Sequence, residues 1–191
     1  IMRFDPRKVL ITGIVACAVS LFFLGRLSLD VGYWTIFWPQ LLQGVSLACL
    51  FVPLTTITMN PIRKEAMGNA TSMFNLMRNL GGSVGIAAVT TLVARNEQVN
   101  TNTLVSHVTP GSPPTQDLLE ALRRSYISRG SDAVGATRRA YVAVFGMVER
   151  QAAILSFNQV FLLLAVLFLL MLPLVFLMKR PSQRIRKIEM H

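Results

Sequence analysis

The residues best suited to chemistry lie together in one long apolar segment, residues 67–94. Arg78 is near its centre, and Asn75 and Asn79 lie three residues before it and one residue after it. On a helix with about 100° per residue, these three side chains fall within one third of the circumference. They share that third with small or polar residues: Thr71, Ser72 and Gly82. The pattern predicts a helix whose polar stripe faces a water-filled cavity or a partner group rather than lipid.

Arg78 is the most informative of these residues. At a rise of 1.5 Å per residue it lies roughly 15 to 18 Å along the helix from Met67, where a charge in a bilayer costs at least about 2.5 to 3.5 kcal/mol. None of the four long apolar segments contains an Asp or Glu, so a carboxylate partner would have to come from outside this sequence. Two interpretations stay open: a role in a transport pathway, or an arginine that snorkels and is satisfied by carbonyl groups, Asn75 or Asn79.

A second polar candidate, Gln43, lies in the apolar segment 33–59. Serine and threonine can hydrogen-bond to their own helix backbone, as Thr55 and Thr56 could, but glutamine does so less easily. We therefore expect Gln43 to point inward. It would make an interhelical hydrogen bond worth about 0.6 kcal/mol, or it would lie behind Arg78 in a pathway.

Small residues form a stripe beside the polar one. Gly81 and Gly85 have the Gly-x-x-x-Gly spacing that lets two membrane helices approach closely, and Gly82 lies next to them. The pattern indicates helix packing or, alternatively, a surface on which helices slide. In residues 33–59, Gly44 is predicted as a packing position and Pro53 as a bend, because proline removes a backbone donor.

The sequence contains no pattern typical of a catalytic or metal-binding site. His107 and His191 have no Ser, Cys or Asp neighbour in a nucleophile pattern, and Cys17 and Cys49 lack companions at metal-ligand spacing. There is no phosphate-binding loop. We therefore predict a protein that is not an enzyme and needs no cofactor.

The composition instead predicts an all-α integral membrane protein. Hydrophobic residues make up 52% of the 191 residues and charged residues only 15%, whereas soluble domains average roughly 25% charged residues. Four segments are near or above the roughly 20 apolar residues that span a bilayer. The predicted spans are residues 9–25, 33–59, 67–94 and 152–178.

The distribution of the basic residues behind the net charge of +10 also fits a membrane protein. Basic residues gather at the N-terminus, in the turn at 60–65 and in the tail 179–191. By the positive-inside rule these three regions are cytoplasmic, and the bases suit anionic lipid headgroups better than nucleic acid. Both termini are then cytoplasmic, and residues 95–151 form an extracytoplasmic loop.

That outer loop has helical character of its own. Residues 101–115 are polar with three prolines and should be irregular. Residues 117–126 and 132–151 have helical apolar spacing, and the second segment should continue into the last span. We expect amphipathic helices lying on the membrane surface, with a docking surface for a partner as the alternative.

Two runs in the spans carry a family resemblance. Residues 43–56 (QGVSLACLFVPLTT) and 68–87 (GNATSMFNLMRNLGGSVGIA) resemble two late spans of the fourteen-span drug:proton antiporters of the major facilitator superfamily, the EmrB/QacA type. Residues 149–153 (ERQAA), with Phe157 and Phe161, are similar to the entry into the last span. Ser46 and Ala48 stand where the family often has glycine.

The resemblance implies the C-terminal four spans of a transporter that exports small hydrophobic, often cationic, drugs by alternating access, driven by a proton gradient. It implies a cytoplasmic (inner) membrane location and a missing N-terminal half that carries the proton-coupling carboxylates. In a two-membrane bacterium it also implies a periplasmic adaptor and an outer-membrane channel. Gln43, Asn75, Arg78 and Asn79 would line the substrate pathway. The alternative is a stand-alone four-span protein that assembles with itself or scaffolds a partner, although two copies of Arg78 at depth would repel each other.

Overall fold

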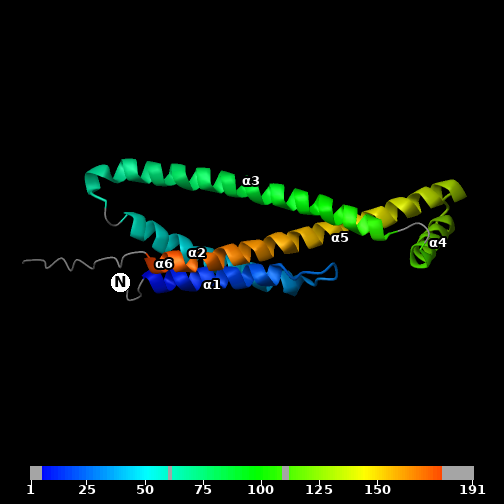
Figure 1. Cartoon of the computed structure of the whole chain (residues 1–191), viewed down its shortest axis with the longest axis horizontal. Coiled ribbons are helices and arrows are strands. Elements are labelled where there is room, and N and C mark those ends of the chain that lie inside the picture. Colours follow the sequence, from blue (N-terminus) through cyan, green and yellow to red (C-terminus); the bar gives the residue numbers. More distant parts are fainter. Residues whose placement is uncertain (1–5, 60–61, 109–111, 178–191) are drawn as a thin grey trace, which may run out of the picture. The chain divides into compact units, whose positions relative to one another are not determined.

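The structure, a computed structural model, describes residues 6–59, 62–108 and 112–177, and over these residues it is helical with no strand (Figure 1). Its elements are α1 (Pro6–Leu24), α2 (Tyr33–Met59), the short 3-10 helix η1 (Lys64–Ala66), α3 (Met67–His107), α4 (Pro113–Ser128), α5 (Ala133–Leu170) and α6 (Leu172–Leu177). The basic tail 179–191 and Asn60 lie outside the described residues.

Four helical segments within the described ranges are long and apolar enough to cross a membrane: Arg7–Leu24, Tyr33–Met59, Lys64–His107 and Ala133–Val175. The predicted all-α membrane class with four spans is therefore confirmed. Threonines in the spans donate to their own backbone, as expected in apolar surroundings. Thr55 donates to the Phe51 carbonyl at 2.9 Å and Thr56 to the Val52 carbonyl at 2.8 Å.

Contacts divide the helices into two compact units. The first unit combines the described parts of residues 1–23, 33–81 and 163–191, and the second combines residues 24–32 and 82–162. The long helices α3 and α5 contribute to both units.

In the first unit, one face of α1 packs against α2 and the chain around α6. Leu10, Ile14 and Val175 are buried at its centre. Gly13 permits the approach of α2, because a Cβ there would lie 3.1 Å from Cβ of Cys49. The buried Ser20 hydroxyl donates to the Pro39 carbonyl at 2.6 Å. Helix α2 contains two prolines, Pro39 and Pro53, and neither can donate a backbone hydrogen bond. Only Pro53 was predicted as a bend.

In the second unit, polar groups join segments far apart in the sequence. Asn158 of α5 donates to the Leu27 carbonyl at 2.7 Å, which ties the α1–α2 connection to α5. Asn100 of α3 donates to the buried Ser156 hydroxyl at 2.9 Å, and Ser156 donates to the Ala152 carbonyl at 2.7 Å. The buried Ser156 hydroxyl therefore has two hydrogen-bond partners, as apolar surroundings require.

Helix α3 corrects one expectation. The predicted third span 67–94 lies within α3, but residues 101–115 were predicted to be irregular, whereas α3 continues to His107 and residues 113–115 belong to α4. Residues 95–107 contain neither glycine nor proline, so nothing local stops the helix. Asn100 also gains its partner on α5 only because the helix continues. Residues 109–111 lie outside the described residues.

The last span is also interrupted. The predicted helix 152–178 begins within α5, but α5 ends at Leu170, Met171 forms a turn, and α6 follows. Pro173 explains the interruption, because its nitrogen has no hydrogen to donate to a carbonyl one turn earlier. Met178 lies outside the described residues.

Local sequence signals set the start of α4, the turn after it and the start of α5. Pro113 starts α4, a position where the missing N–H costs nothing. After α4 the chain turns at Gly130, whose φ of 90° favours glycine. Asp132 then caps α5, because its carboxylate accepts a hydrogen bond from the Gly135 N–H at 3.1 Å.

Candidate functional site

The candidate site is built around Arg78 on α3 and Phe51 on α2, both in the first unit. The guanidinium carbon of Arg78 lies 4.9 Å from the centre of the Phe51 ring. A cation over an aromatic face gains about 0.5 to 1 kcal/mol when exposed and about 2 kcal/mol when desolvated. Arg78 has no acidic partner among the described residues. Arg78 is exposed in this structure, and the aromatic ring supplies part of the compensation that a charge within a membrane span requires.

Phe51 also belongs to the wall of an apolar cavity in the first unit. The cavity has a volume of about 430 Å³ and lies between α1, α2 and the chain around α6. Its lining residues are all apolar: Leu10, Ile14, Leu47, Leu50, Phe51, Leu54, Phe168, Met171, Leu174 and Val175. This volume is in the range of about 300 to 1,000 Å³ that holds small organic molecules. An apolar pocket with one cation at its edge suits a hydrophobic molecule.

The other predicted pathway residues differ in their surroundings. Asn75 and Asn79 are exposed on α3, on the same face as Arg78, and Gln43 is half-buried on α2. Gln43 and Asn75 make no hydrogen bond within the described part of the chain. The expected interhelical bond of Gln43 is therefore not formed among these residues.

The predicted packing residues also separate into two groups. Pro53 is buried inside α2. A Cβ placed on Gly44, Gly81, Gly82 or Gly85 would meet nothing within 4 Å in the described structure. The small-residue stripe of α3 therefore has no helix against it in this part of the protein.

Sequence reasoning did not find Phe51 or Gly13. Phe51 lies inside the quoted run 43–56, but nothing in its local spacing marks it as the neighbour of Arg78. Gly13 is one glycine in an apolar span, and only its contact with Cys49 shows that α1 and α2 need it. Aromatic residues in the helix before an intramembrane arginine were the available signal for Phe51, since they provide the face a cation prefers.

Comparisons with known proteins identify the family of the chain. A sequence profile described as Major Facilitator Superfamily matches residues 1–96. The chain therefore belongs to the major facilitator superfamily, a family of membrane transporters.

Curated relatives are of the EmrB type. The fatty acid resistance protein FarB of Neisseria gonorrhoeae is 28% identical over 94% of this chain and 34% of its own length. The multidrug export protein EmrB of Escherichia coli K12 is 33% identical over 75% of this chain and 27% of its own length. The colistin resistance protein EmrB of Acinetobacter baumannii is 25% identical over 87% of this chain and 32% of its own length. No solved structure matches the chain.

The chain thus spans about a third of the length of the curated relatives it matches. Its helices and its family make it a multi-pass protein of the bacterial cytoplasmic membrane. The lipid bilayer is the partner that this family implies.

Proposed function

We propose that the chain is the C-terminal part of a proton-driven exporter of hydrophobic small molecules, which works by alternating access. The observation that carries the proposal is the pair of Arg78 and Phe51 at the edge of the apolar cavity. Hydrophobic molecules would bind against the cavity wall, and Arg78 would contact their polar groups. Asn75 and Asn79, on the same helix face, would provide further hydrogen bonds, with Gln43 behind them.

The charge at this site favours some substrates over others. Arg78 attracts anionic or electron-rich groups and repels cations, so we propose that hydrophobic anions and neutral aromatic molecules contact it more readily than cations do. One relative is named for resistance to fatty acids, which are hydrophobic acids. That name supports an anionic substrate, whereas the family resemblance implied hydrophobic, often cationic, drugs.

The rest of the transporter must supply two functions. None of the predicted apolar spans 9–25, 33–59, 67–94 and 152–178 contains a carboxylate, so the proton-coupling acid would lie in the N-terminal half. That half would also pack on the stripe of Gly81, Gly82 and Gly85, which is uncovered in the described structure. Substrate sites in such transporters lie between two halves, so this part alone would not transport.

The proposed topology follows the basic residues. The N-terminus, the turn at 60–65 and the tail 179–191 would face the cytoplasm, and the outer ends of α3 and α5 with α4 would face outward. In a two-membrane bacterium, a periplasmic adaptor and an outer-membrane channel would complete the export route.

The test uses everted membrane vesicles that contain the complete transporter, with an acidic lumen. We expect accumulation of a fluorescent hydrophobic substrate, loss of accumulation on adding a protonophore, and no requirement for ATP. Arg78→Gln should lower uptake of a hydrophobic anion by about tenfold, because a hydrogen bond to a charged group contributes about 1.5 to 3 kcal/mol. Uptake of a hydrophobic cation of similar size should change less.

Phe51→Leu, which removes the ring face beside Arg78, should also lower uptake of the anion. Phe23→Leu is its matched control, because Phe23 is 56% exposed and lies outside this cavity. Unchanged uptake in Arg78→Gln at normal protein level would remove Arg78 from the pathway. Transport that persists after the proton gradient is collapsed would contradict proton coupling. If Arg78→Gln instead abolished the protein itself, the stand-alone assembly role would be favoured.

A further inference from the structure

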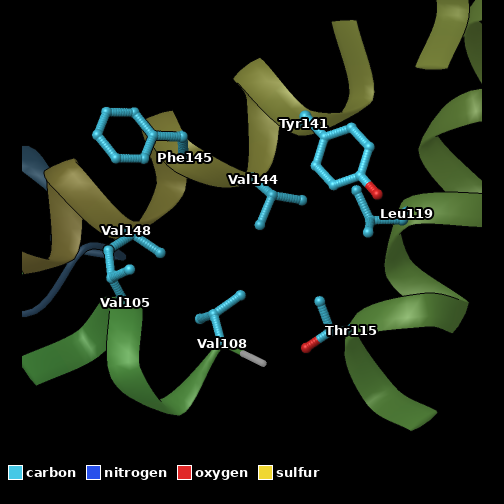
Figure 2. Close-up of a pocket in the computed structure, with 8 residues that line it drawn as sticks. All are labelled: Val105, Val108, Thr115, Leu119, Tyr141, Val144, Phe145 and Val148. Carbon is cyan, nitrogen blue, oxygen red and sulfur yellow. The ribbon is translucent and has the colours of Figure 1, made fainter. Parts of the chain in front are cut away.

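A second apolar hollow lies in the second unit, where the end of α3, α4 and the start of α5 meet (Figure 2). Its volume is about 160 Å³. It is lined by Val105, Val108, Thr115, Leu119, Tyr141, Val144, Phe145 and Val148. An engineered apolar cavity of about 150 Å³ is large enough to bind benzene. The hollow can therefore hold a ring or a short length of alkyl chain.

The hollow continues into a neighbouring one of about 320 Å³. The two share four lining residues: Val108, Thr115, Val144 and Val148. Together they form one apolar crevice beneath α4. Tyr141 and Phe145 remain 54% and 50% exposed at its edge, so the crevice is open to a ligand.

Two arginines lie at the end of this crevice nearest the α4–α5 connection. Arg123 is one helical turn beyond Leu119 on α4, and Arg138 is one turn before Tyr141 on α5. Residues three or four positions apart share a helix face, so each arginine lies on the face that lines the crevice. On each helix, the arginine is nearer than the lining residue to the connection at residues 129–132.

Of the other three arginines near the connection, Arg129 lies in the connection itself and two are already occupied. Arg124 forms an ion pair with Glu120 at 2.6 Å, and Arg139 donates to the Ser131 hydroxyl at 2.7 Å. Arg123 and Arg138 have no hydrogen-bond or ion-pair partner among the described residues. The Tyr141 hydroxyl, which points toward α4 in Figure 2, likewise makes no hydrogen bond there. The crevice end therefore carries two positive charges and one hydroxyl donor with nothing to bind.

With α3 and α5 crossing the bilayer along their axes at the charge-free stretches 67–94 and 151–178 apart from Arg78, the crevice would lie beyond the bilayer edge. Arg95 and Arg150 mark the ends of the apolar stretches of α3 and α5. Val105 and Tyr141 lie about 15 Å and 13 Å farther along their helix axes. The headgroup layer adds only about 5 to 7 Å on each side of the hydrocarbon core. Lipid headgroups therefore do not account for this cluster of charge and apolar surface.

We propose that the crevice binds a single-chain amphipathic anion, with its apolar part against Leu119, Val144 and Val148 and its acidic head between Arg123 and Arg138. An alkyl carboxylate has the required chemistry, because a carboxylate accepts hydrogen bonds from guanidinium groups in the fork geometry that arginine provides. This site is separate from the cavity beside Arg78, and its occupancy does not depend on transport.

The test uses membranes that contain the protein and a twelve-carbon carboxylate carrying a photoreactive group near its tail. A twelve-carbon alcohol with the same group is the uncharged control probe. After illumination, mass spectrometry should find the carboxylate on peptides that contain Val105, Val144 or Val148. Labelling by the carboxylate should exceed labelling by the alcohol.

The double variant Arg123→Gln/Arg138→Gln should reduce carboxylate labelling by about tenfold or more, since hydrogen bonds to charged groups are strong, and leave alcohol labelling unchanged. The matched double variant Arg124→Gln/Arg139→Gln removes the same charge from the same region and should retain labelling. Val148→Phe, which fills the crevice, should reduce labelling by both probes.

Three results would overturn the proposal. Equal loss in both double variants would mean that net charge, not the crevice, attracts the probe. Labelling confined to the apolar spans would mean that the probe partitions into lipid. Crevice residues that crosslink to another protein in native membranes would make this face a protein interface.

Discussion

Gly25 and Leu162 approach so closely that a Cβ on the glycine would lie 2.8 Å from Cγ of the leucine. The same Cβ would lie 3.2 Å from the Asn158 carbonyl oxygen. Because Asn158 also donates to the Leu27 carbonyl, this contact and that hydrogen bond hold the α1–α2 connection against α5. A glycine at position 25 is required for steric reasons, since its φ is not in the left-handed region.

The first prediction follows from this contact. Gly25→Ala should destabilise the protein by about 1 to 3 kcal/mol, the usual cost of overpacking, and lower its unfolding temperature in detergent. Leu162→Ala combined with Gly25→Ala should recover part of the loss, because it removes the side chain that the new methyl group meets. Gly32→Ala is the control, since a Cβ there meets nothing within 4 Å. Equal unfolding temperatures for the two single variants would disprove the contact.

A second prediction concerns the pair of Arg78 and Phe51. Phe51→Leu keeps an apolar side chain but removes the ring face, so we expect a coupling of about 0.5 to 2 kcal/mol with Arg78→Gln in a double-mutant cycle. Phe51→Trp should preserve or strengthen the interaction. The measurement is the Kd of a fluorescent hydrophobic anion for the purified complete transporter. Strictly additive effects would mean that the ring does not act through the guanidinium.

A third prediction tests the uncovered glycines of α3. Gly85→Leu adds a side chain where the described structure has open space. If the N-terminal half packs there, the variant should lower transport strongly in the complete protein. Gly146→Leu on α5 also faces open space and should have little effect. Normal transport by Gly85→Leu would exclude close helix packing at this stripe.

A fourth prediction concerns the hydrogen bond between Asn100 and Ser156. Ala152, one turn before Ser156, is also fully buried, so a cysteine at position 152, with Cys17 and Cys49 replaced by serine, should react slowly with a water-soluble maleimide and leaves the Asn100–Ser156 bond in place. Asn100→Ala removes the polar contact between α3 and α5, worth about 1 kcal/mol, and should increase the labelling rate about fivefold. Asn102→Ala, two residues along the same helix, should leave the rate unchanged. A rate unaffected by Asn100→Ala would mean that the bond does not hold the outer helices together.

Several features were predictable because they depend on local properties of the chain. Long stretches without charge, such as residues 151–178, predict membrane helices, since their length and hydropathy decide whether they can span a bilayer. Arg78 was recognisable because a charge in such a stretch is costly wherever the helix lies. Both inferences require only the order of residues along one helix.

The end of α3 was not predictable in the same way. Residues 95–107 are polar and have weak helical periodicity, so local reasoning assigned them to a loop. Their helix is held by Asn100, whose partner Ser156 is 56 residues away in the sequence. Contacts between such distant residues depend on how helices pack, and that packing is not encoded in either segment alone.

The glycines show most clearly the difference between what local spacing predicts and what helix packing decides. Sequence spacing singled out Gly81 and Gly85, which meet nothing in the described structure, and passed over Gly13 and Gly25, which lie against other helices. Likewise, Arg78 was identified from the sequence alone, but its neighbour Phe51 was not. The sequence by itself determined the membrane class, the spans and the costly charge, because these follow from the free energy of transferring each residue into lipid. Only the tertiary structure decided which glycine permits a close approach and which ring meets the arginine, because both depend on the relative rotation and spacing of packed helices.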